Sequence, residues 1–303
     1  MISRCNIKMF LVNFYYGKFY MKVSVGIPFY NAELFLADAI KSVIQQSFQD
    51  WELILVNDGS TDQSLSIAKE FAKKDHRIRV ISDGLNKKLP YRLNQIINES
   101  KYDYIARMDA DDLIHPDRLK IQLEFLENNK KFDLVSTGVI SINDKNQVKG
   151  IRRVNEIYTD FSEVKRHYPI VHASILARKE WYLRNRYNQD LPRTEDFELW
   201  CRCISNNDLK LAVLPKALYY YREEGLVTAE KLKRSYIDGL NVYKQYCIKP
   251  KLKVILSSKL KIFVVNLFNR FGLLQYLIAI RNRKAVDSNL IAYHANIVGK
   301  IIK

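Results

Sequence analysis

Three carboxylates fall within four residues at Asp109-Ala110-Asp111-Asp112, directly after the apolar stretch at residues 104–106. Neighbouring negative charges repel one another, and a divalent cation that also contacts phosphate oxygens is the commonest partner for such a cluster in enzymes. The cluster therefore predicts a metal and phosphate site. By itself, however, an acidic cluster is also typical of a solvated turn.

A second acidic turn, Asn57-Asp58-Gly59-Ser60-Thr61-Asp62, closes the apolar run at residues 51–56. Ligands of open α/β sheets bind beyond the carboxyl ends of the strands, so both turns can face one crevice. Taken alone, Asp58-Gly59 is an ordinary turn signal. The occurrence of two such turns, each after a strand-like segment, favours a shared site.

The hydrophobic pattern predicts strands that alternate with helices. Strands are expected at residues 22–28, 51–56, 78–82, 104–108 and 134–140, and helices at residues 31–46, 62–73, 93–100 and 116–128. This alternation predicts an α/β fold with a mostly parallel, doubly wound sheet. The polar stretch at residues 144–168 gives no clear assignment.

The composition is that of an ordered globular protein, with 303 residues, 48% hydrophobic content, 10 Gly and 7 Pro. Its four cysteines have no metal-ligand spacing, and a reduced, cytoplasmic chain is the simplest interpretation. Residues 1–20 are too short and polar to span a bilayer and lack a small-residue cleavage site, so no signal peptide is expected. Met21 is a candidate start of the folded unit.

Positive charge is concentrated near the carboxyl end. Of the net charge of +16, residues 226–303 carry +12, from 15 Lys and Arg against 3 Asp and Glu. An apolar stretch at residues 262–280 follows several lysines but contains Arg270, which argues against a transmembrane helix. We expect either an amphipathic helix on an anionic membrane surface or a helix packed on the rest of the chain. No nucleic-acid motif accompanies the charge, so nucleic acid is not expected as a partner.

Four motifs in a fixed order closely resemble those of family 2 glycosyltransferases of the GT-A fold, over roughly residues 22–225. The motifs are Pro28-Phe29-Tyr30-Asn31, Asn57-Asp58-Gly59-Ser60-Thr61-Asp62, Ile105-Ala106-Arg107-Met108-Asp109-Ala110-Asp111-Asp112 with Pro116-Asp117-Arg118-Leu119 and Gln122, and Glu195-Asp196-Phe197-Glu198-Leu199-Trp200. The joint occurrence makes the resemblance specific.

The resemblance implies roles for the donor side of the site. Pro28 and Tyr30 would line a nucleotide pocket, and Asp58 would contact the base or ribose. Asp109 and Asp111 would form the D-x-D pair, one near the ribose and one holding Mg²⁺ or Mn²⁺ on the diphosphate of a nucleotide-diphosphate sugar.

Three further residues are implied on the acceptor side. Asp196, beside Glu195, resembles the general base, although acids at this place are also typical of a helix start. His172 stands where the family often has a histidine facing the donor diphosphate or acceptor. A histidine within an apolar strand is more often a core residue whose hydrogen bonds are satisfied.

The chain departs from the family pattern at Lys88, where glycine is usual, and at Leu93, where arginine is usual. Lys88 or Arg92 could instead supply a cation to the phosphates. The segment Tyr221-Arg222 lacks the histidine that usually follows it. These departures leave the donor contacts in this part of the site open.

The resemblance implies an inverting, metal-dependent glycosyltransferase that moves a hexose or N-acetylhexosamine from a UDP-sugar. The implied acceptor is a lipid-linked oligosaccharide in bacterial O-antigen or capsule assembly, which places the enzyme on the inner face of the plasma membrane. We expect a basic, helical membrane-surface segment at residues 226–303 after a catalytic domain at residues 21–225 and an extension at residues 1–20. Two alternatives remain: a non-catalytic nucleotide-sugar or membrane-binding module, and a sugar nucleotidyltransferase.

Overall fold

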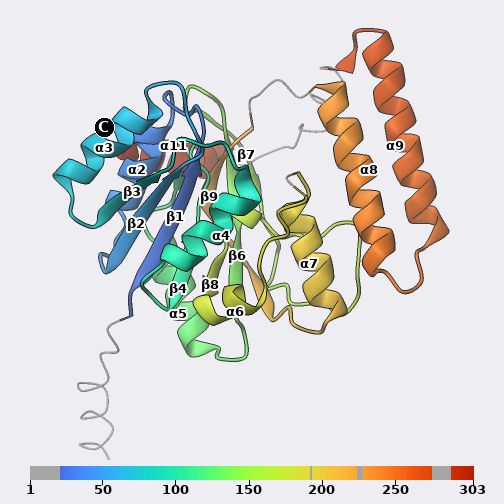
Figure 1. The fold of residues 1–303 in the computed structure, drawn as a ribbon, viewed down its shortest axis with the longest axis horizontal. Coiled ribbons are helices and arrows are strands. Elements are labelled where there is room, and N and C mark those ends of the chain that lie inside the picture. The colour runs from blue at the N-terminus through green and yellow to red at the C-terminus, as the bar shows by residue number, and fades with distance from the viewer. Residues whose placement is uncertain (1–20, 192, 224–227, 275–287) are drawn as a thin grey trace, which may run out of the picture.

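A nine-stranded sheet flanked by helices forms the body of the protein in the computed structural model, which describes residues 21–191, 193–223, 228–274 and 288–303 (Figure 1). The strands are β1 (Val23–Phe29), β2 (Trp51–Asn57), β3 (Ile78–Ser82), β4 (Tyr104–Arg107), β5 (Leu113–Ile114), β6 (Leu134–Ile142), β7 (Val148–Arg152), β8 (Leu176–Arg178) and β9 (Leu211–Arg222). The helices are α2 (Leu36–Ile44), α3 (Ser64–Lys74), α4 (Leu89–Glu99), α5 (Arg118–Asn128), α6 (Lys179–Arg184), α7 (Glu195–Ser205), α8 (Ala229–Tyr246), α9 (Leu252–Arg270) and α11 (Ser288–Ile301). The predicted extension at residues 1–20 lies outside the described residues.

The sheet has the strand order β3-β2-β1-β4-β8-β6-β9-β5, with β7 paired to β6. Strands β3, β2, β1 and β4 are all parallel, as the alternation of strands and helices predicts. The remaining strands make the sheet mixed, since β8 is antiparallel to β4 and β6, β7 to β6, and β5 to β9. The predicted α/β class is thus confirmed, and the parallel order holds for the amino-terminal half of the sheet.

Alternating residues of the parallel strands fill two cores. Leu53 and Leu55 of β2 face the core that contains α2, α3 and α5, whereas Ile54 and Val56 face the core that contains α4, α6 and α7. Every residue of β2 is buried, whichever face of the sheet it points to. This is the pattern of a parallel sheet that is covered on both faces. This packing fixes the positions of the carboxyl ends of the parallel strands relative to one another.

The region between β6 and α7 differs most from the sequence-based expectation. The unassigned polar stretch contains β7, which extends the sheet beside β6. The prediction that His172 lies within an apolar strand is wrong, because residues His172–Ser174 form a 3₁₀ turn ahead of β8. Ser174 explains the turn: its Oγ donates to the Val171 carbonyl at 2.9 Å and accepts from the Thr137 N–H at 3.0 Å.

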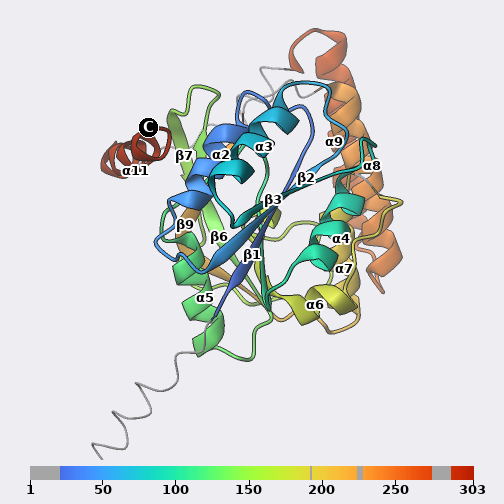
Figure 2. The ribbon, with the colours of Figure 1, turned by 60° about the vertical axis from the view of Figure 1, so that its left-hand side comes forward.

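The residues after β9 form two separate structures. Helices α8 and α9 pair with each other, and α8 lies against α7, at the right of Figure 1. Helix α11 instead returns to the sheet beside β7 and α2, as Figure 2 shows. There the Lys41 Nζ donates to the Ile302 carbonyl and the Gln45 Nε2 to the Ile301 carbonyl, both at 3.0 Å.

The predicted apolar helix at residues 262–280 begins earlier than expected, at Leu252, and α9 ends at Arg270. Residues 275–280 of that prediction lie outside the described residues. Among the helices that the structure describes, none is long and apolar enough to cross a membrane.

Candidate active site

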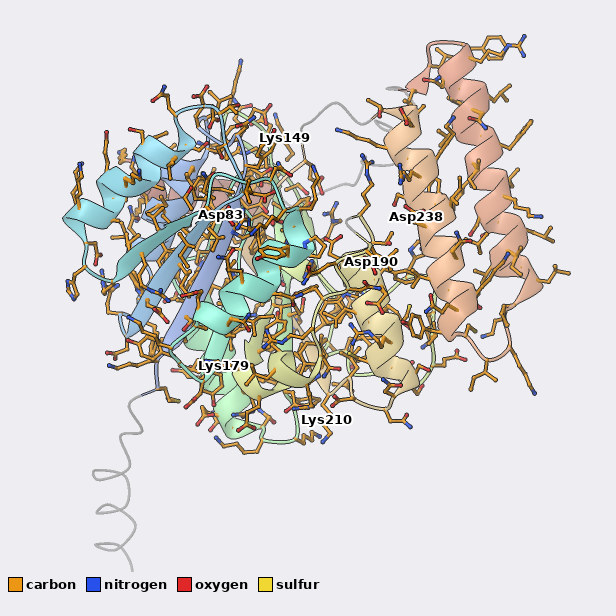
Figure 3. The ribbon with its side chains drawn as sticks, viewed as in Figure 1. Asp83, Lys149, Lys179, Asp190, Lys210 and Asp238 are labelled. Atoms are coloured by element: carbon orange, nitrogen blue, oxygen red, sulfur yellow. The ribbon has the colours of Figure 1, made fainter. Side chains whose placement is uncertain are left out.

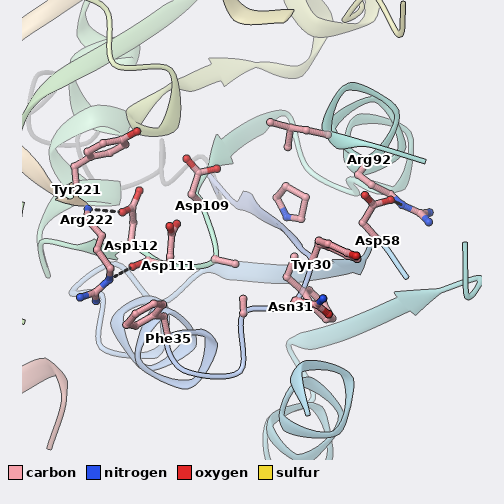
Figure 4. A pocket seen from close by; sticks show the side chains of 15 residues that line it. Tyr30, Asn31, Phe35, Asp58, Arg92, Asp109, Asp111, Asp112, Tyr221 and Arg222 are labelled. Atoms are coloured by element: carbon pink, nitrogen blue, oxygen red, sulfur yellow. Dashed lines mark hydrogen bonds and ion pairs between the residues drawn. The ribbon is translucent and has the colours of Figure 1, made fainter. Parts of the chain in front are cut away.

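A cavity of about 430 Å³ lies at the carboxyl ends of β1, β2 and β4, where the motifs predicted it. Figure 4 shows Asp58 and Arg92 at one end of this pocket, Asp111 and Arg222 at the other, and Tyr30 between them. Its lining includes six of the predicted site residues: Pro28, Tyr30, Asp58, Arg92, Asp109 and Asp111. We call this cavity the donor pocket.

The first two motifs are joined to each other by hydrogen bonds. The Asn31 Oδ1 accepts from the Thr61 N–H at 2.8 Å, and the Ser60 Oγ accepts from the Asn31 N–H at 3.1 Å. The Glu33 N–H donates to the Asp62 carboxylate at 3.0 Å. Polar residues of these two motifs therefore fix one wall of the donor pocket.

Asp58 is buried and its carboxylate binds the loop before α4. The Oδ1 accepts from the Lys87 N–H at 2.7 Å and from the Arg92 Nε at 2.9 Å, and the Oδ2 accepts from the Lys88 N–H at 3.1 Å. A carboxylate can accept about four hydrogen bonds, so one position on Oδ2 is left. The Arg92 guanidinium is itself fully buried and pairs with Asp83 at 2.6 Å as well as with Asp58.

The backbone at Lys88 has a conformation that glycine adopts most readily. Lys88 has φ 71° and ψ 162°, a region that is essentially restricted to glycine and costs other residues about 1–3 kcal/mol. Gly59 supports the same loop, since a Cβ at this position would lie only 2.9 Å from the backbone of Leu85 and Asn86. Lys88 does not line the donor pocket, although its N–H holds Asp58.

The acidic turn, residues 109–112, uses its three carboxylates in different ways. Asp109 forms an ion pair with Arg107 at 2.7 Å. Asp112 is buried, where it accepts from the Tyr219 hydroxyl at 2.8 Å and from the Arg222 N–H at 2.7 Å. The Asp111 carboxylate faces the donor pocket and forms no ion pair with the described part of the chain.

Desolvation sets the proton affinity of this turn. It raises the pKa of Asp111, although solvent reaches this side chain from the mouth of the pocket, and the neighbouring charge of Asp109 acts in the same direction. Burial and the charges of Asp111 and Asp109 raise the pKa of Asp112 well above its usual value. A cation near Asp111 would relieve this repulsion.

The donor set suits a cation that is bound mainly by phosphate. Among the described residues, no cluster of three His, Cys, Asp or Glu side chains could form an all-protein metal site. Mg²⁺ usually takes one or two carboxylates and completes its shell with substrate phosphates and water. Asp111, with Asp109 beside it, fits that arrangement.

The predicted acceptor-side carboxylates, Glu195 and Asp196, occupy the first turn of α7 and lie outside the donor pocket lining. We call them the α7 pair. Burial raises the pKa of Glu195 to about 7, helped by the charge of Asp196, and the Glu195 Oε2 is buried without a hydrogen-bond partner. Burial also raises the pKa of Asp196, whose Oδ1 accepts from the Phe197 N–H at 2.7 Å.

His172 lies behind this pair in an aromatic cluster. Its Nε2 is 2.8 Å from the Tyr187 hydroxyl, and its ring meets Trp200 edge to face with centroids 5.8 Å apart. Burial and the charge of Arg107 hold the pKa of His172 well below its usual value. His172 is therefore a neutral side chain that packs on α7, apart from the donor pocket lining.

Arg107 is a site residue that sequence reasoning did not single out. It is buried, its Nε has no hydrogen-bond partner, and its charge acts on Asp109 and on both members of the α7 pair. It thus connects the acidic turn to α7. Its place at the carboxyl end of β4, two residues before Asp109, is a local signal that could have identified it.

Comparisons with known proteins agree with this geometry. Residues 24–190 match the profile described as Glycosyl transferase family 2. The EpsE protein of Bacillus subtilis (strain 168), named as a glycosyltransferase, is 35% identical over 76% of this chain and 84% of its own length. An uncharacterized glycosyltransferase of Haemophilus influenzae is 31% identical over 82% of each chain.

Solved structures of the S. aureus protein TarS share the fold. A TarS complex with UDP has a TM-score of 0.56 at 22% identity, over 77% of this chain and 68% of that one. A complex with UDP-GlcNAc has a TM-score of 0.57 at 21% identity. With the fold, the motifs and the pocket in agreement, the chain belongs to the family 2 glycosyltransferases.

Proposed function

We propose that this glycosyltransferase transfers a hexose or N-acetylhexosamine from a UDP-sugar, with inversion of the anomeric configuration and with Mg²⁺ or Mn²⁺ as the required cation. The proposed acceptor is a lipid-linked oligosaccharide in O-antigen or capsule assembly. The observation that carries the proposal is that three separate motifs line one cavity, with Asp58 at one end and Asp111 at the other. The neighbouring TarS structures are described as complexes with UDP and UDP-GlcNAc, which supports the choice of donor.

Asp58 and Tyr30 are suited to the nucleoside. Uracil offers one N–H donor along its pairing edge, and the Asp58 Oδ2 retains one position that can accept it. Tyr30 is 51% exposed at the pocket wall, where its ring can cover the base. Arg92 then acts through Asp58, whose carboxylate it fixes, and Lys88, which lies outside the pocket lining, supports the same carboxylate through its N–H. A contact of the Lys88 ammonium with phosphate stays a prediction.

Asp111 and Asp109 are suited to the diphosphate and ribose. A bound cation would offset the charge that develops on the departing UDP. Arg222 braces this end, because its Nε donates to the Asp111 carbonyl at 2.7 Å and its guanidinium lies 4.1 Å from the Phe35 ring centre.

Asp196 is proposed as the base. It takes the proton of the acceptor hydroxyl while that oxygen bonds to the anomeric carbon, and the bond from this carbon to the diphosphate oxygen breaks on the opposite face. Its raised pKa makes it a better proton acceptor than an exposed aspartate. Glu195 and Arg107 set the charge around it. One displacement inverts the anomeric configuration.

The first experiment measures donor use directly. The purified chain is incubated with Mn²⁺ and a panel of UDP-, GDP- and dTDP-sugars, and both nucleotide diphosphate release and metal-dependent affinity are recorded. Selective use of one UDP-sugar, lost in Asp111→Ala but kept in the exposed control Asp190→Ala, is the expected result. Equal binding with and without Mn²⁺, or preference for a GDP- or dTDP-sugar, would contradict the metal or donor assignment.

A further inference from the structure

Helix α9 carries a row of large apolar side chains that no described element covers. They are between 40% and 68% exposed: Leu252, Leu256, Leu260, Phe263, Leu267 and, at the end of the helix, Phe271. Successive members are three or four residues apart, so they share one side of the helix over its whole length. We call this row the outer face of α9.

The other side of α9 is occupied by the protein itself. Ser258 and Val265 are each 2% exposed, and Val265 packs with Leu232 and Tyr236 of α8. Helix α9 is therefore apolar on two sides. One side packs on α8, with which it forms a helix pair that we call the α8–α9 hairpin, and the other side faces solvent. Figure 3 shows the side chains along α9 that project away from the body of the protein. The outer face is thus not needed for contact with α8.

Positive charge accompanies the outer face. Helix α9 has four cations, Lys253, Lys259, Lys261 and Arg270, and the sequence has no Asp or Glu between Asp238 and Asp287. Of the four, Lys261 lies over the Tyr236 ring of α8, on the side away from the outer face. Apolar residues accompanied by Lys and Arg alone match an anionic lipid surface, where the apolar side enters the acyl boundary and the cations meet headgroups. A second copy of the chain is a poorer match, since two such faces would bring like charges together.

We propose that the outer face of α9 docks this protein on an anionic bilayer, with the helix parallel to the membrane plane. This inference deepens and rests on the proposed function, because a lipid-linked acceptor is what such a surface would serve. It also assigns the partner to a defined face, whereas the sequence pattern indicated only residues 262–280.

The hairpin is joined to the helix that bears the α7 pair. On α8, the Tyr246 hydroxyl donates to the Glu198 carboxylate of α7 at 2.7 Å. Gly239 of α8 lies so close to the Arg166 guanidinium that a Cβ there would be 2.7 Å from it. Arg166 in turn lies 5.1 Å from the ring centre of Phe197, the residue after Asp196. Docking through α9 would therefore fix the orientation of α7 relative to the membrane.

Vesicle flotation of the full chain tests the proposal. We expect binding to vesicles that contain phosphatidylglycerol, weaker binding at high salt, and little binding to phosphatidylcholine alone. The variant Leu256→Glu/Phe263→Glu should bind at least about tenfold more weakly. The matched control Ile157→Glu/Leu183→Glu, at comparably exposed positions elsewhere, should bind as the wild type does.

Two further measurements separate the possible failures. Mn²⁺-dependent UDP affinity, measured without vesicles, should be unchanged in both variants, and Leu256→Ser/Phe263→Ser should repeat the loss of binding without adding charge. Wild-type protein that binds UDP but not the anionic vesicles would overturn the docking proposal and leave the donor assignment intact. A wild-type dimer that dissociates in the Leu256→Glu/Phe263→Glu variant would assign the face to a second copy and overturn it as well.

Discussion

The acidic turn and the α7 pair are both built from neighbouring carboxylates whose pKa burial raises, yet the partners of these carboxylates differ. In the turn, Asp109 has an arginine partner and Asp112 has a tyrosine hydroxyl and a backbone N–H. Glu195 is buried with one oxygen unpartnered, and its pKa is raised to about 7. Asp111, which faces the pocket between two partnered carboxylates, suits binding of a cation, and the α7 pair suits proton transfer. The environment, not the residue type, separates the two tasks.

The largest expected effect on this comparison comes from replacing Asp196, the proposed base. Asp196→Asn should lower the rate of sugar transfer by about 10²–10⁴-fold, because the amide cannot take the acceptor proton. Affinity for UDP with Mn²⁺ should stay within about twofold, since α7 lies outside the donor pocket lining. Asp190→Asn is the matched control. Transfer that survives in Asp196→Asn would move the base to Glu195.

Arg107 should matter for stability as well as for rate. Arg107→Gln removes the buried cation that pairs with half-buried Asp109, and we expect the free energy of unfolding to fall by about 2–3 kcal/mol. Urea denaturation measures this loss. The double variant Arg107→Gln/Asp109→Asn should recover part of it, because position 109 then carries no charge that needs a cation. An unchanged urea midpoint in the single variant would show that the ion pair is not stabilising.

The α7 pair predicts a dependence of stability on pH. The folded pKa of Glu195, about 7, lies above the ordinary value of 4.5, so the folded state binds this proton more tightly than the unfolded state. Stability should therefore fall as pH rises from about 4.5 to about 7, by on the order of 2 kcal/mol. Glu195→Gln should flatten this slope in urea titrations across the range. A wild-type slope that persists in Glu195→Gln would assign the proton to another group.

The smallest expected effect is on the donor side. Lys88→Gly should raise the free energy of unfolding by about 1 kcal/mol, since glycine adopts the observed backbone angles without strain. If Lys88 contributes to phosphate binding, UDP affinity should fall in the same variant. Lys87→Gly, at the preceding position, serves as a control that should not be stabilising. If both the stability and the UDP affinity of Lys88→Gly rise, then Lys88 does not contribute to binding of the donor.

Much of the donor side could be predicted because its signals are local. Strand ends followed by Asp58 or Asp109 depend on hydrophobic periodicity and turn chemistry within a few residues, and parallel pairing then brings those ends together. Even the strain at Lys88 has a local signal, a lysine where the family uses glycine. The motifs and the residues next to them were therefore sufficient to predict that these side chains lie around one cavity.

The rest could not be predicted because it depends on distant partners. The turn at His172 follows from hydrogen bonds of Ser174 to Thr137, which is 37 residues away. The contact of Asp112 with Tyr219 spans 107 residues. The outer face of α9 was partly concealed by the apolar residues on its other side, since a helix that is apolar on two sides has little one-sided pattern. In each of these cases, contacts between residues that are distant in the sequence determine the structure.

The return of α11 to the sheet has a consequence for folding and for protein engineering. Val298 and Ile301 pack with Leu113, Ile140 and Tyr220, so α11 completes a core whose other members come much earlier in the sequence. During synthesis this patch of the sheet stays uncovered until α11 has been made. A truncation meant to remove the basic region would also expose this core. Excision of the α8–α9 hairpin with α11 retained would keep this core covered, but it would uncover the side of α7 that α8 contacts.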